Sequence, residues 1–300
     1  MKALVTGGAG FVGRHLVAHL DECGDEIAVF DRAGEHAMDV TDADAVRRTI
    51  EAVRPEVVFH LAAVSHVGAS WSAPAQVFRV NAEGTLQVLR SCADARVERV
   101  VVVGSADVYG AVAPSDLPIT EEAPIRPVTP YGASKAAADV LALQAFLGDG
   151  LETVRVRAFN HTGPGQSPKF LVPALAGRIA EAERDGSTEV ALGALEPVRD
   201  LSDVRDVVRA YRLLAEQGEA GEAYNVCSGR GVSVAEVAER LVQRSTRDLR
   251  ITVDPDRVRP VDVPRLVGDP AKLHAATGWE PGIRLDETLR AVLDAARAAQ

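Results

Sequence analysis

The 300-residue chain is poor in several residue types that mark particular classes of protein. It has three Cys, scattered at positions 23, 92 and 227, so a disulfide framework is not expected and the thiols should be reduced. No uninterrupted apolar stretch approaches the length of a membrane span. The opening MKALVTGG leaves no room for a signal peptide before the first strand. We therefore expect a cytoplasmic protein with no membrane partner.

Basic charge is also lacking, because the formal net charge is -10 at pH 7. Nucleic-acid binding usually needs a basic face, so no nucleic-acid partner is expected. No His, Cys or carboxylate cluster has the spacing of metal ligands, and the sequence predicts no metal site. A hydrophobic content of 47% with 25% charged residues is ordinary for a globular protein.

Short β-branched runs recur along the sequence: ALVT, IAVF, EVVFH, VERVVVVG and ETVRVRAF. Helical periodicity fills the intervals, as in Val12, Leu16, Val17 and Leu20. Apolar strands that alternate with helices are typical of a parallel sheet covered on both faces. The sequence therefore predicts an α/β fold with a Rossmann-type doubly wound parallel sheet.

The alternation of strands and helices becomes less regular from about residue 160, where loops containing Pro, Gly and Arg appear. We interpret this part as a smaller C-terminal substrate-binding lobe. The predicted boundaries are 1–158 plus roughly 200–227 for the dinucleotide-binding domain. The ranges 159–199 and 228–300 are predicted to form the lobe.

The stretch LVTGGAGFVGRHL follows the first expected strand and opens the first expected helix. Gly7, Gly10 and Gly13 would allow a tight turn, a close approach of backbone N–H groups to a pyrophosphate, and close packing of helix on strand. Asp31 ends the second strand, where a carboxylate accepts hydrogen bonds from an adenosine ribose and repels a ribose phosphate. It therefore favours NAD over NADP, although the neighbouring Arg32 weakens that preference.

A second motif involves two scarce residue types, since the chain has only four Tyr and four Lys. In VTPYGASKAAAD, Tyr131 precedes Lys135 by four positions, so both side chains should emerge on one face of a helix. A Tyr ordinarily titrates near pH 10. We expect the Lys135 ammonium to favour the phenolate and lower the pKa of Tyr131, which would prepare Tyr131 for acid/base catalysis.

Further motifs stand in register with these two along the chain: AMDVTD, HLAA, GSADVYG and YGASK. This order of motifs resembles the extended short-chain dehydrogenase/reductase family. The resemblance implies that Ser105, Tyr131 and Lys135 form the catalytic set and that Asn81 supports the site. Asp31 makes NAD(H) the favoured cofactor, with NADP(H) as the alternative, and the resemblance implies a homodimer that pairs through two helices per subunit. The cofactor-binding residues it implies are Gly7, Gly10, Phe11, Val12, Gly13, Asp31, Arg32, Asp39, Val40, Leu61, Ala62, Ala63, Tyr131 and Lys135.

The second half of the chain is similar to the GDP-mannose branch of the nucleotide-sugar enzymes, in particular GDP-4-keto-6-deoxy-mannose reductases and GDP-mannose 4,6-dehydratases. The similar segments include RAFNHTGPGQSP and LGALEPVRDLSDVRD. The similarity implies a nucleotide-diphosphate sugar as substrate, with a GDP-sugar favoured. Its substrate-binding residues would be Ser105, Asp107, Tyr131, Asn160, Arg199 and Arg259. Arg suits a diphosphate because its planar guanidinium donates two parallel hydrogen bonds.

The sequence specifies the reaction less closely than it specifies the family. A dehydratase needs an additional acid/base carboxylate, usually a Glu, where this chain has Asp107 preceded by Ala106. Asp is one methylene shorter, and a displacement of about 1 Å can cost on the order of a hundredfold in rate. We therefore favour a reductase, although NAD suits a dehydratase or a 4-epimerase better. A non-catalytic dinucleotide sensor is the remaining alternative, but such proteins typically lack the Tyr or the Lys.

Overall fold

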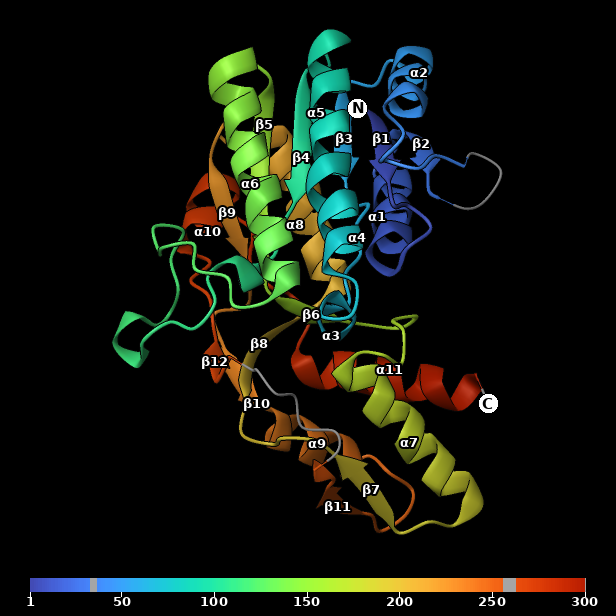
Figure 1. The fold of residues 1–300 in the computed structure, drawn as a ribbon. Helices are drawn as coiled ribbons and strands as arrows, with labels where there is room; N and C mark the ends of the chain where they lie inside the picture. The colour runs from blue at the N-terminus through green and yellow to red at the C-terminus, as the bar shows by residue number, and fades with distance from the viewer. Residues whose placement is uncertain (33–36, 256–262, 300) are drawn as a thin grey trace.

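The computed structural model describes residues 1–32, 37–255 and 263–299. A six-stranded sheet in the order β2-β1-β3-β4-β5-β9 forms the centre of the upper part of the molecule (Figure 1). Every strand pair in it is parallel. Its strands are β1 (Lys2–Thr6), β2 (Glu26–Phe30), β3 (Val57–His60), β4 (Arg99–Val103), β5 (Glu152–Ala158) and β9 (Ala223–Val226). The predicted α/β fold with a parallel sheet is confirmed.

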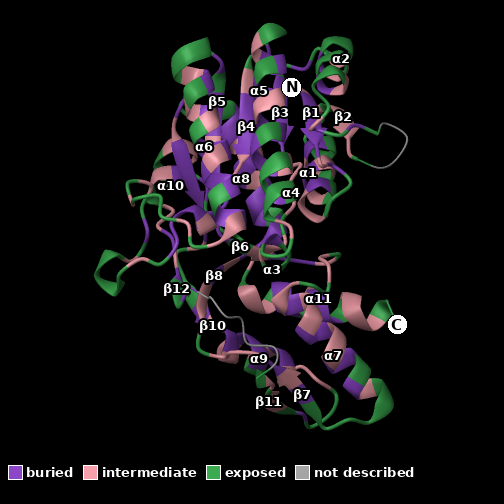
Figure 2. Cartoon of the chain, viewed as in Figure 1, coloured by how far each residue is buried: buried purple, intermediate pink, exposed green. Residues whose placement is uncertain are grey.

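Helices cover both faces of this sheet. One face carries α1 (Phe11–Glu22), α8 (Val204–Gln217) and α10 (Ala271–Thr277), and the other carries α2 (Ala43–Val53), α5 (Gly84–Asp94) and α6 (Pro130–Asp149). Alternate side chains of β1 show the division, because Ala3 and Val5 pack into the first core and Leu4 into the second. Burial on both faces explains why the strands are nearly continuous apolar runs (Figure 2).

Local signals place the start and end of α6, the helix that carries Tyr131 and Lys135. The Thr129 hydroxyl oxygen accepts a hydrogen bond from the Gly132 N–H at 3.0 Å, and Pro130 occupies the first helical turn. At the other end Gly150 has a φ of 71°, a left-handed conformation that Gly adopts without strain. The sequence between these two caps therefore forms one helix of 20 residues.

A smaller lobe lies below the sheet in Figure 1 and has its own hydrophobic core. Its strands β8, β10 and β12 form one sheet, with β6 paired to β8, while β7 and β11 form another. The lobe contains α7 (Leu171–Asp185), β7 (Glu189–Leu192), β8 (Val198–Asp203), β10 (Gly231–Ser233), α9 (Val234–Val242), β11 (Arg250–Val253), β12 (Arg265–Leu266) and α11 (Leu285–Ala298). At the junction of the two parts lie β6 (Asn160–Thr162) and the short helix α3 (Val67–Ser70) (Figure 1). The short helix α4 (Pro74–Phe78) and the π-helical turn Arg79–Glu83 lead directly into α5 and pack beside α6. Two 3₁₀ turns, Ala106–Val108 and Pro114–Asp116, follow β4.

The chain passes between the two parts several times. After β8 it returns to the sheet as α8 and β9, and after β12 it returns as α10. Leu273 and Trp279, which fall in the segment predicted for the lobe, pack in the same core as α1 and α8. The indole of Trp279 donates to the Asp206 carbonyl at 2.9 Å. The predicted domain boundaries remain a prediction.

Candidate active site

A cavity of about 1100 Å³ lies between the carboxyl edge of the central sheet and the lobe. Loops that follow β1, β2, β3, β4 and β5 line one side, and residues from α7, β7 and β8 line the other. All of the residues predicted to bind the cofactor line this cavity: Gly7, Gly10, Phe11, Val12, Gly13, Asp31, Arg32, Asp39, Val40, Leu61, Ala62, Ala63, Tyr131 and Lys135. Ser105, Asp107, Asn160 and Arg199 also line it, whereas Arg259 lies outside the described residues.

The glycine-rich loop after β1 has no room for side chains at two of its positions. A Cβ at Gly13 would lie 2.3 Å from the Gly7 carbonyl oxygen, and a Cβ at Gly7 would lie 2.8 Å from the Ala62 nitrogen. Gly7 also has a φ of 73°, and its N–H donates to the Phe30 carbonyl at 2.8 Å. The loop therefore lies flat against β2 and β3, and the start of α1 faces the cavity. This geometry fits a pyrophosphate.

Asp31 lies at the end of β2 beside this loop. One carboxylate oxygen accepts from the Ala9 N–H at 3.1 Å, and the other accepts from the Arg32 N–H at 2.7 Å. Asp39, farther along, accepts from the backbone N–H of Thr41 at 2.9 Å and from its hydroxyl at 2.8 Å. These hydrogen bonds lower the pKa of Asp39. Both carboxylates are therefore held in place and contribute negative charge at this end of the cavity.

Tyr131, Lys135 and Ser105 all line the cavity. Lys135 is buried, and its ammonium donates to the Val103 carbonyl at the end of β4, 2.8 Å away. The Ser105 hydroxyl donates to an Asp107 carboxylate oxygen at 2.9 Å, while the Asp107 N–H donates back to the Ser105 oxygen at 3.1 Å. The Tyr131 and Ser105 side chains also form a hydrogen bond.

One expectation about Tyr131 is wrong. Its pKa is raised from 10.0, not lowered, because burial disfavours the phenolate and the nearby Asp107 charge adds to the effect. The hydrogen bond with Ser105 only partly opposes this shift. Lys135 is not among the groups that lower the pKa of Tyr131, and its ammonium is directed at Val103. The side chain of Tyr131 therefore carries its proton at neutral pH.

Asn81 lies in the π-helical turn and links two segments that line the cavity. Its side-chain oxygen accepts from the Val64 N–H at 2.8 Å, and its side-chain nitrogen donates to the Val64 carbonyl and to the Ser134 hydroxyl. The Ser134 hydroxyl in turn donates to the Tyr131 carbonyl at 2.7 Å. Asn81 thus joins the loop after β3 to the first turn of α6.

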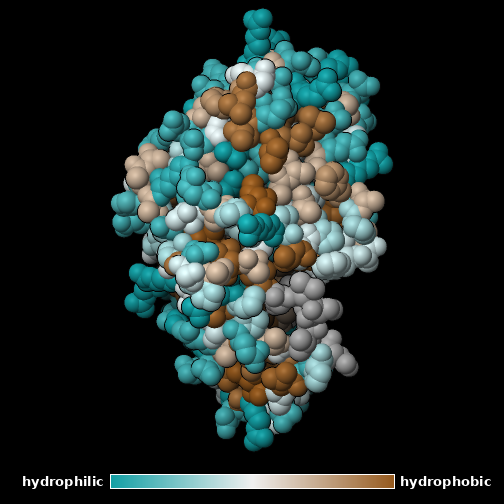
Figure 3. Space-filling model, turned by 60° about the vertical axis from the view of Figure 1, so that its left-hand side comes forward, coloured by the Kyte–Doolittle hydropathy of each residue, from teal (hydrophilic) through white to brown (hydrophobic). Residues whose placement is uncertain are grey.

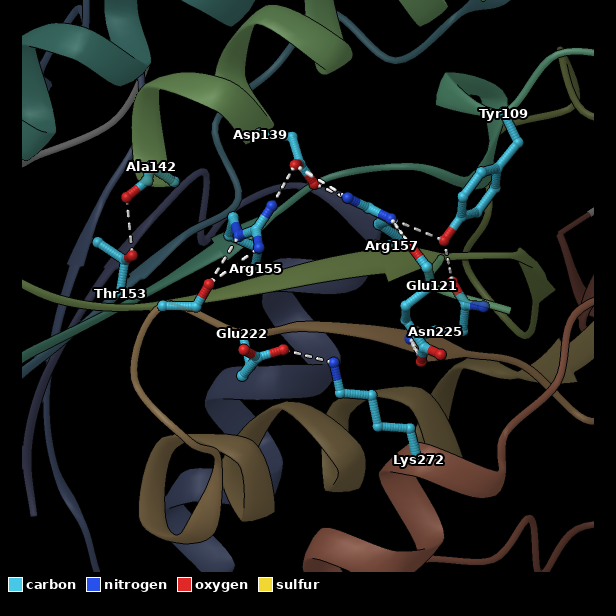
Figure 4. Close-up of polar contacts among 11 residues, drawn as sticks. Tyr109, Glu121, Asp139, Ala142, Thr153, Arg155, Arg157, Glu222, Asn225 and Lys272 are labelled. Atoms are coloured by element: carbon cyan, nitrogen blue, oxygen red, sulfur yellow. Dashed lines mark hydrogen bonds and ion pairs between the residues drawn. The ribbon is translucent and has the colours of Figure 1, made fainter. Parts of the chain in front are cut away.

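A buried ion network supports α6 from the side of β5 and β9 (Figure 4). The Asp139 carboxylate accepts from Arg155 at 2.7 Å and from Arg157 at 2.9 Å. Arg157 also donates to the Tyr109 hydroxyl at 3.0 Å, and Tyr109 donates to the Asn225 side chain at 2.7 Å. The network connects α6 with the turn that follows Asp107. Removing one partner of such a buried pair typically costs about 3–5 kcal/mol of stability.

The lobe side of the cavity contains cationic residues that the sequence analysis did not single out. Lys169, just before α7, and Arg178, within it, both line the cavity with Arg199. Lys169 could have been found by its rarity, whereas Arg178 has no distinguishing local signal because Arg is abundant in this chain. Within the described part of the chain, no group of His, Cys, Asp and Glu is arranged to hold a metal ion. None of the described helices is both long and apolar enough to span a membrane.

Comparison with known proteins identifies the family. The family model described as "NAD dependent epimerase/dehydratase family" matches residues 3–227, which is well over half of the chain. The chain belongs to this family. The predicted extended short-chain dehydrogenase/reductase membership and the NAD(P)-dependent enzyme class are thereby confirmed.

Individual relatives of this family match over nearly the whole chain. A GDP-6-deoxy-D-mannose reductase from Pseudomonas aeruginosa is 36% identical over 97% of this chain and 96% of its own. The structure of RMD from Pseudomonas aeruginosa with NADPH is 34% identical and has a TM-score of 0.91 over 100% of both chains. The Thermus thermophilus UDP-glucose 4-epimerase with NAD is 32% identical and has a TM-score of 0.89, again over 100% of both.

The buried ammonium of Lys135 generates a stability prediction. Burial lowers its pKa from 10.5 to about 8. Below pH 8 both the folded and the unfolded chain carry the proton, so the full penalty for burying the charge is present. Between about pH 8 and pH 10.5 only the unfolded chain still binds the proton, so this penalty falls as the pH rises. We expect Lys135→Met to raise the free energy of unfolding at pH 7 by about 1–3 kcal/mol.

Urea unfolding at pH 7 and at pH 10 measures this effect, and the advantage of Lys135→Met should shrink at the higher pH. Lys169→Met is the matched control, because Lys169 is exposed and its replacement should leave both values nearly unchanged. A Lys135→Met variant that is less stable than the parent at both pH values would contradict the prediction.

Proposed function

We propose that this protein is a reductase that acts on a GDP-4-keto-6-deoxy-hexose and yields a GDP-6-deoxy-mannose type of product. Tyr131 would give its proton to the keto oxygen at the fourth carbon of the sugar. The reduced nicotinamide, when bound, supplies the hydride. A reduction needs a proton donor, and a Tyr131 whose pKa is raised is protonated at neutral pH. The relative named GDP-6-deoxy-D-mannose reductase supports the same reaction.

The other residues of the cavity would bind and orient. Lys135 would hold the nicotinamide ribose, and Ser105 would contact the reacting oxygen beside Tyr131. The diphosphate would be held by Asn160, Arg199 and Arg259, and the cationic Lys169 suits the same anion. GDP is the favoured nucleotide because two of the relatives are named as GDP-6-deoxy-sugar enzymes.

A dehydratase is the first alternative, and Asp107 argues against it. An elimination requires a carboxylate that is available to remove a proton from the fifth carbon or protonate the leaving oxygen at the sixth. One oxygen of Asp107 already accepts the Ser105 hydroxyl at 2.9 Å, and the preceding residue, Ala106, has no acid/base group. A 4-epimerase is the second alternative, supported by the likeness to the NAD-bound epimerase. A non-catalytic sensor fits poorly with a complete set of Ser105, Tyr131 and Lys135.

A stoichiometry assay distinguishes these reactions. With a GDP-4-keto-6-deoxy sugar we expect one reduced nicotinamide to be oxidised per sugar reduced, and little or no water loss from GDP-mannose. Tyr131→Phe should lower turnover by roughly 10²- to 10⁴-fold and leave cofactor affinity nearly intact. Asp107→Asn should have a modest effect, because the amide oxygen can still accept from Ser105. Absorbance of the nicotinamide and mass spectrometry of the sugar provide the measurements.

The opposite result would be efficient conversion of GDP-mannose to its 4-keto-6-deoxy product with no net use of cofactor. If Asp107→Asn abolished that conversion, Asp107 would be the elimination catalyst and the protein a dehydratase. Interconversion of a nucleotide sugar with its 4-epimer, without net use of cofactor, would identify an epimerase.

The proposed preference for NAD(H) over NADP(H) rests on Asp31. Its carboxylate would repel a 2′-phosphate, and we expect Asp31→Ala to narrow the ratio of the two affinities. The variant also loses the bond to the Ala9 N–H, so both affinities should fall, but that loss is common to both cofactors. Titrations with NADH and NADPH measure the ratio. Tighter binding of NADPH by the parent protein would overturn this interpretation of Asp31 and favour Arg32 as a phosphate partner.

We also propose that the protein works in the cytoplasm as a homodimer that pairs through α5 and α6. Two apolar side chains on α6 are exposed, Val140 at 56% and Leu147 at 73%. Figure 3 shows brown, hydrophobic residues in the upper half of the face, the half of the molecule that contains α6 in Figure 1, and another brown group near its lower end. Burying such side chains at a subunit interface would stabilise a dimer.

We expect the Val140→Lys, Leu147→Lys double variant to be monomeric, because a dimer would have to bury two unpaired ammonium groups from each subunit. Light scattering coupled to size-exclusion chromatography measures the mass. Val253→Lys is the matched control, since Val253 is 55% exposed but lies on β11 of the lobe. A parent protein that is already monomeric would refute the proposed dimer. A double variant that stays dimeric would place the interface elsewhere.

A further inference from the structure

His66 lies on the loop that follows β3, and its two ring nitrogens have different surroundings. The Nδ1 atom accepts a hydrogen bond from the Ala69 N–H at 2.9 Å. An imidazole nitrogen that accepts carries no proton, so the proton of the neutral ring is on Nε2. Among the described residues this Nε2–H has no hydrogen-bond partner. The side chain is half-buried and lines the cavity, so a ligand in the cavity can reach the unused donor.

Three contacts fix the orientation of this ring. The bond from Ala69 holds one edge of the ring at the start of α3. The Phe170 ring packs edge to face against it, with the centroids 6.0 Å apart and the planes at 72°. Gly68 leaves room for the ring, because a Cβ there would lie 3.0 Å from the His66 Cε1 atom. The direction of the Nε2–H is therefore set before a ligand binds, which lowers the entropic cost of the contact.

The ring lies where the lobe meets the loops of the central sheet. α3 is at this junction in Figure 1, and Phe170, which directly precedes α7, brings the lobe to the ring. Lys169, the residue before Phe170, lines the lobe side of the cavity together with Arg178. The nucleotide sugar is proposed to bind on this side, whereas the adenosine of the dinucleotide belongs near Asp31.

We propose that the Nε2–H of His66 donates a hydrogen bond to an oxygen of the bound nucleotide sugar. The inference rests on the function proposed above and adds a substrate-binding residue to it. The acceptor is an oxygen of the diphosphate or of the hexose, because both offer lone pairs to an N–H donor. A diphosphate oxygen would form the stronger bond, since it is charged.

Two substitutions separate ligand binding from the local structural role of His66. Asn is a favoured residue at a helix start, where its side-chain oxygen can accept from the Ala69 N–H, but it is too short to reach the position of Nε2. Gln is longer and can place an N–H near that position, but it is not a favoured cap. We therefore expect His66→Asn to keep the cap and lose the ligand contact, and His66→Gln to do the reverse.

Isothermal titration calorimetry with GDP-mannose, GDP and NADH measures the contact. If the acceptor is a hexose oxygen, His66→Asn should weaken GDP-mannose roughly 2- to 10-fold and bind GDP like the parent. If the acceptor is a diphosphate oxygen, both ligands should weaken roughly 10- to 100-fold. NADH affinity should be unchanged in either case. His66→Gln should bind GDP-mannose more tightly than His66→Asn does.

His19→Asn is the matched control. His19 is also half-buried, but it lies on α1 outside the cavity lining, and His and Asn have similar helix propensities. This variant should bind all three ligands like the parent. Without ligand, His66→Asn should unfold at the same temperature as the parent, because the Ala69 N–H keeps an acceptor. His66→Gln should unfold at a lower temperature.

Each failure has its own signature. If the parent binds neither GDP nor GDP-mannose, the proposed substrate class fails, and the assignment of His66 fails with it. If the parent binds both but His66→Asn binds them equally well, the proposed contact is overturned and His66 serves only as a cap. If His66→Asn loses NADH affinity, alone or together with the other two ligands, the donor does not recognise the nucleotide sugar and the proposal is also overturned.

Discussion

All six strands of the central sheet run in the same direction, so every strand delivers its following loop to the same edge. The glycine-rich loop after β1, Asp31 after β2, the loop after β3 and Ser105 after β4 are adjacent for this reason alone. The lobe closes the same edge from the other side, because the chain leaves the sheet after β5 and β9 and enters the lobe through β6 and β10. The cavity is a direct consequence of this topology.

This arrangement requires several polar groups to be buried next to one another. The Asp139 carboxylate is buried between Arg155 and Arg157, and this pairing holds α6 against β5. His60 is held between the hydroxyls of Thr6 and Thr85, and burial lowers its pKa to about 3, so it stays neutral. Both groups are satisfied within the protein. Lys135 and Tyr211 are different, because the first is buried without a counter-ion bonded to it and the second without any partner.

This difference connects stability with the proposed chemistry. A buried ammonium and an unpaired phenol both lower the stability of the folded chain, and both residues border the cavity. Functional sites are commonly destabilising in this way, since groups prepared for a ligand are incompletely satisfied without it. The raised pKa of Tyr131 belongs to the same pattern: exclusion of water keeps the phenol protonated, which suits a proton donor better than a base.

The sequence by itself determined the fold class, the family and the positions of the glycine-rich loop and the Tyr131–Lys135 pair. These features depend on local spacing: strand and helix periods, a turn that only Gly can form, and an (i, i+4) pair on one helical face. Only the tertiary structure decided that Tyr131 is protonated, that Lys169 and Arg178 line the cavity, that Trp279 joins the core of the sheet, and that the Tyr211 hydroxyl is buried without a hydrogen-bond partner. Burial and charge at a site depend on residues from distant parts of the chain, and no local pattern in the sequence encodes them.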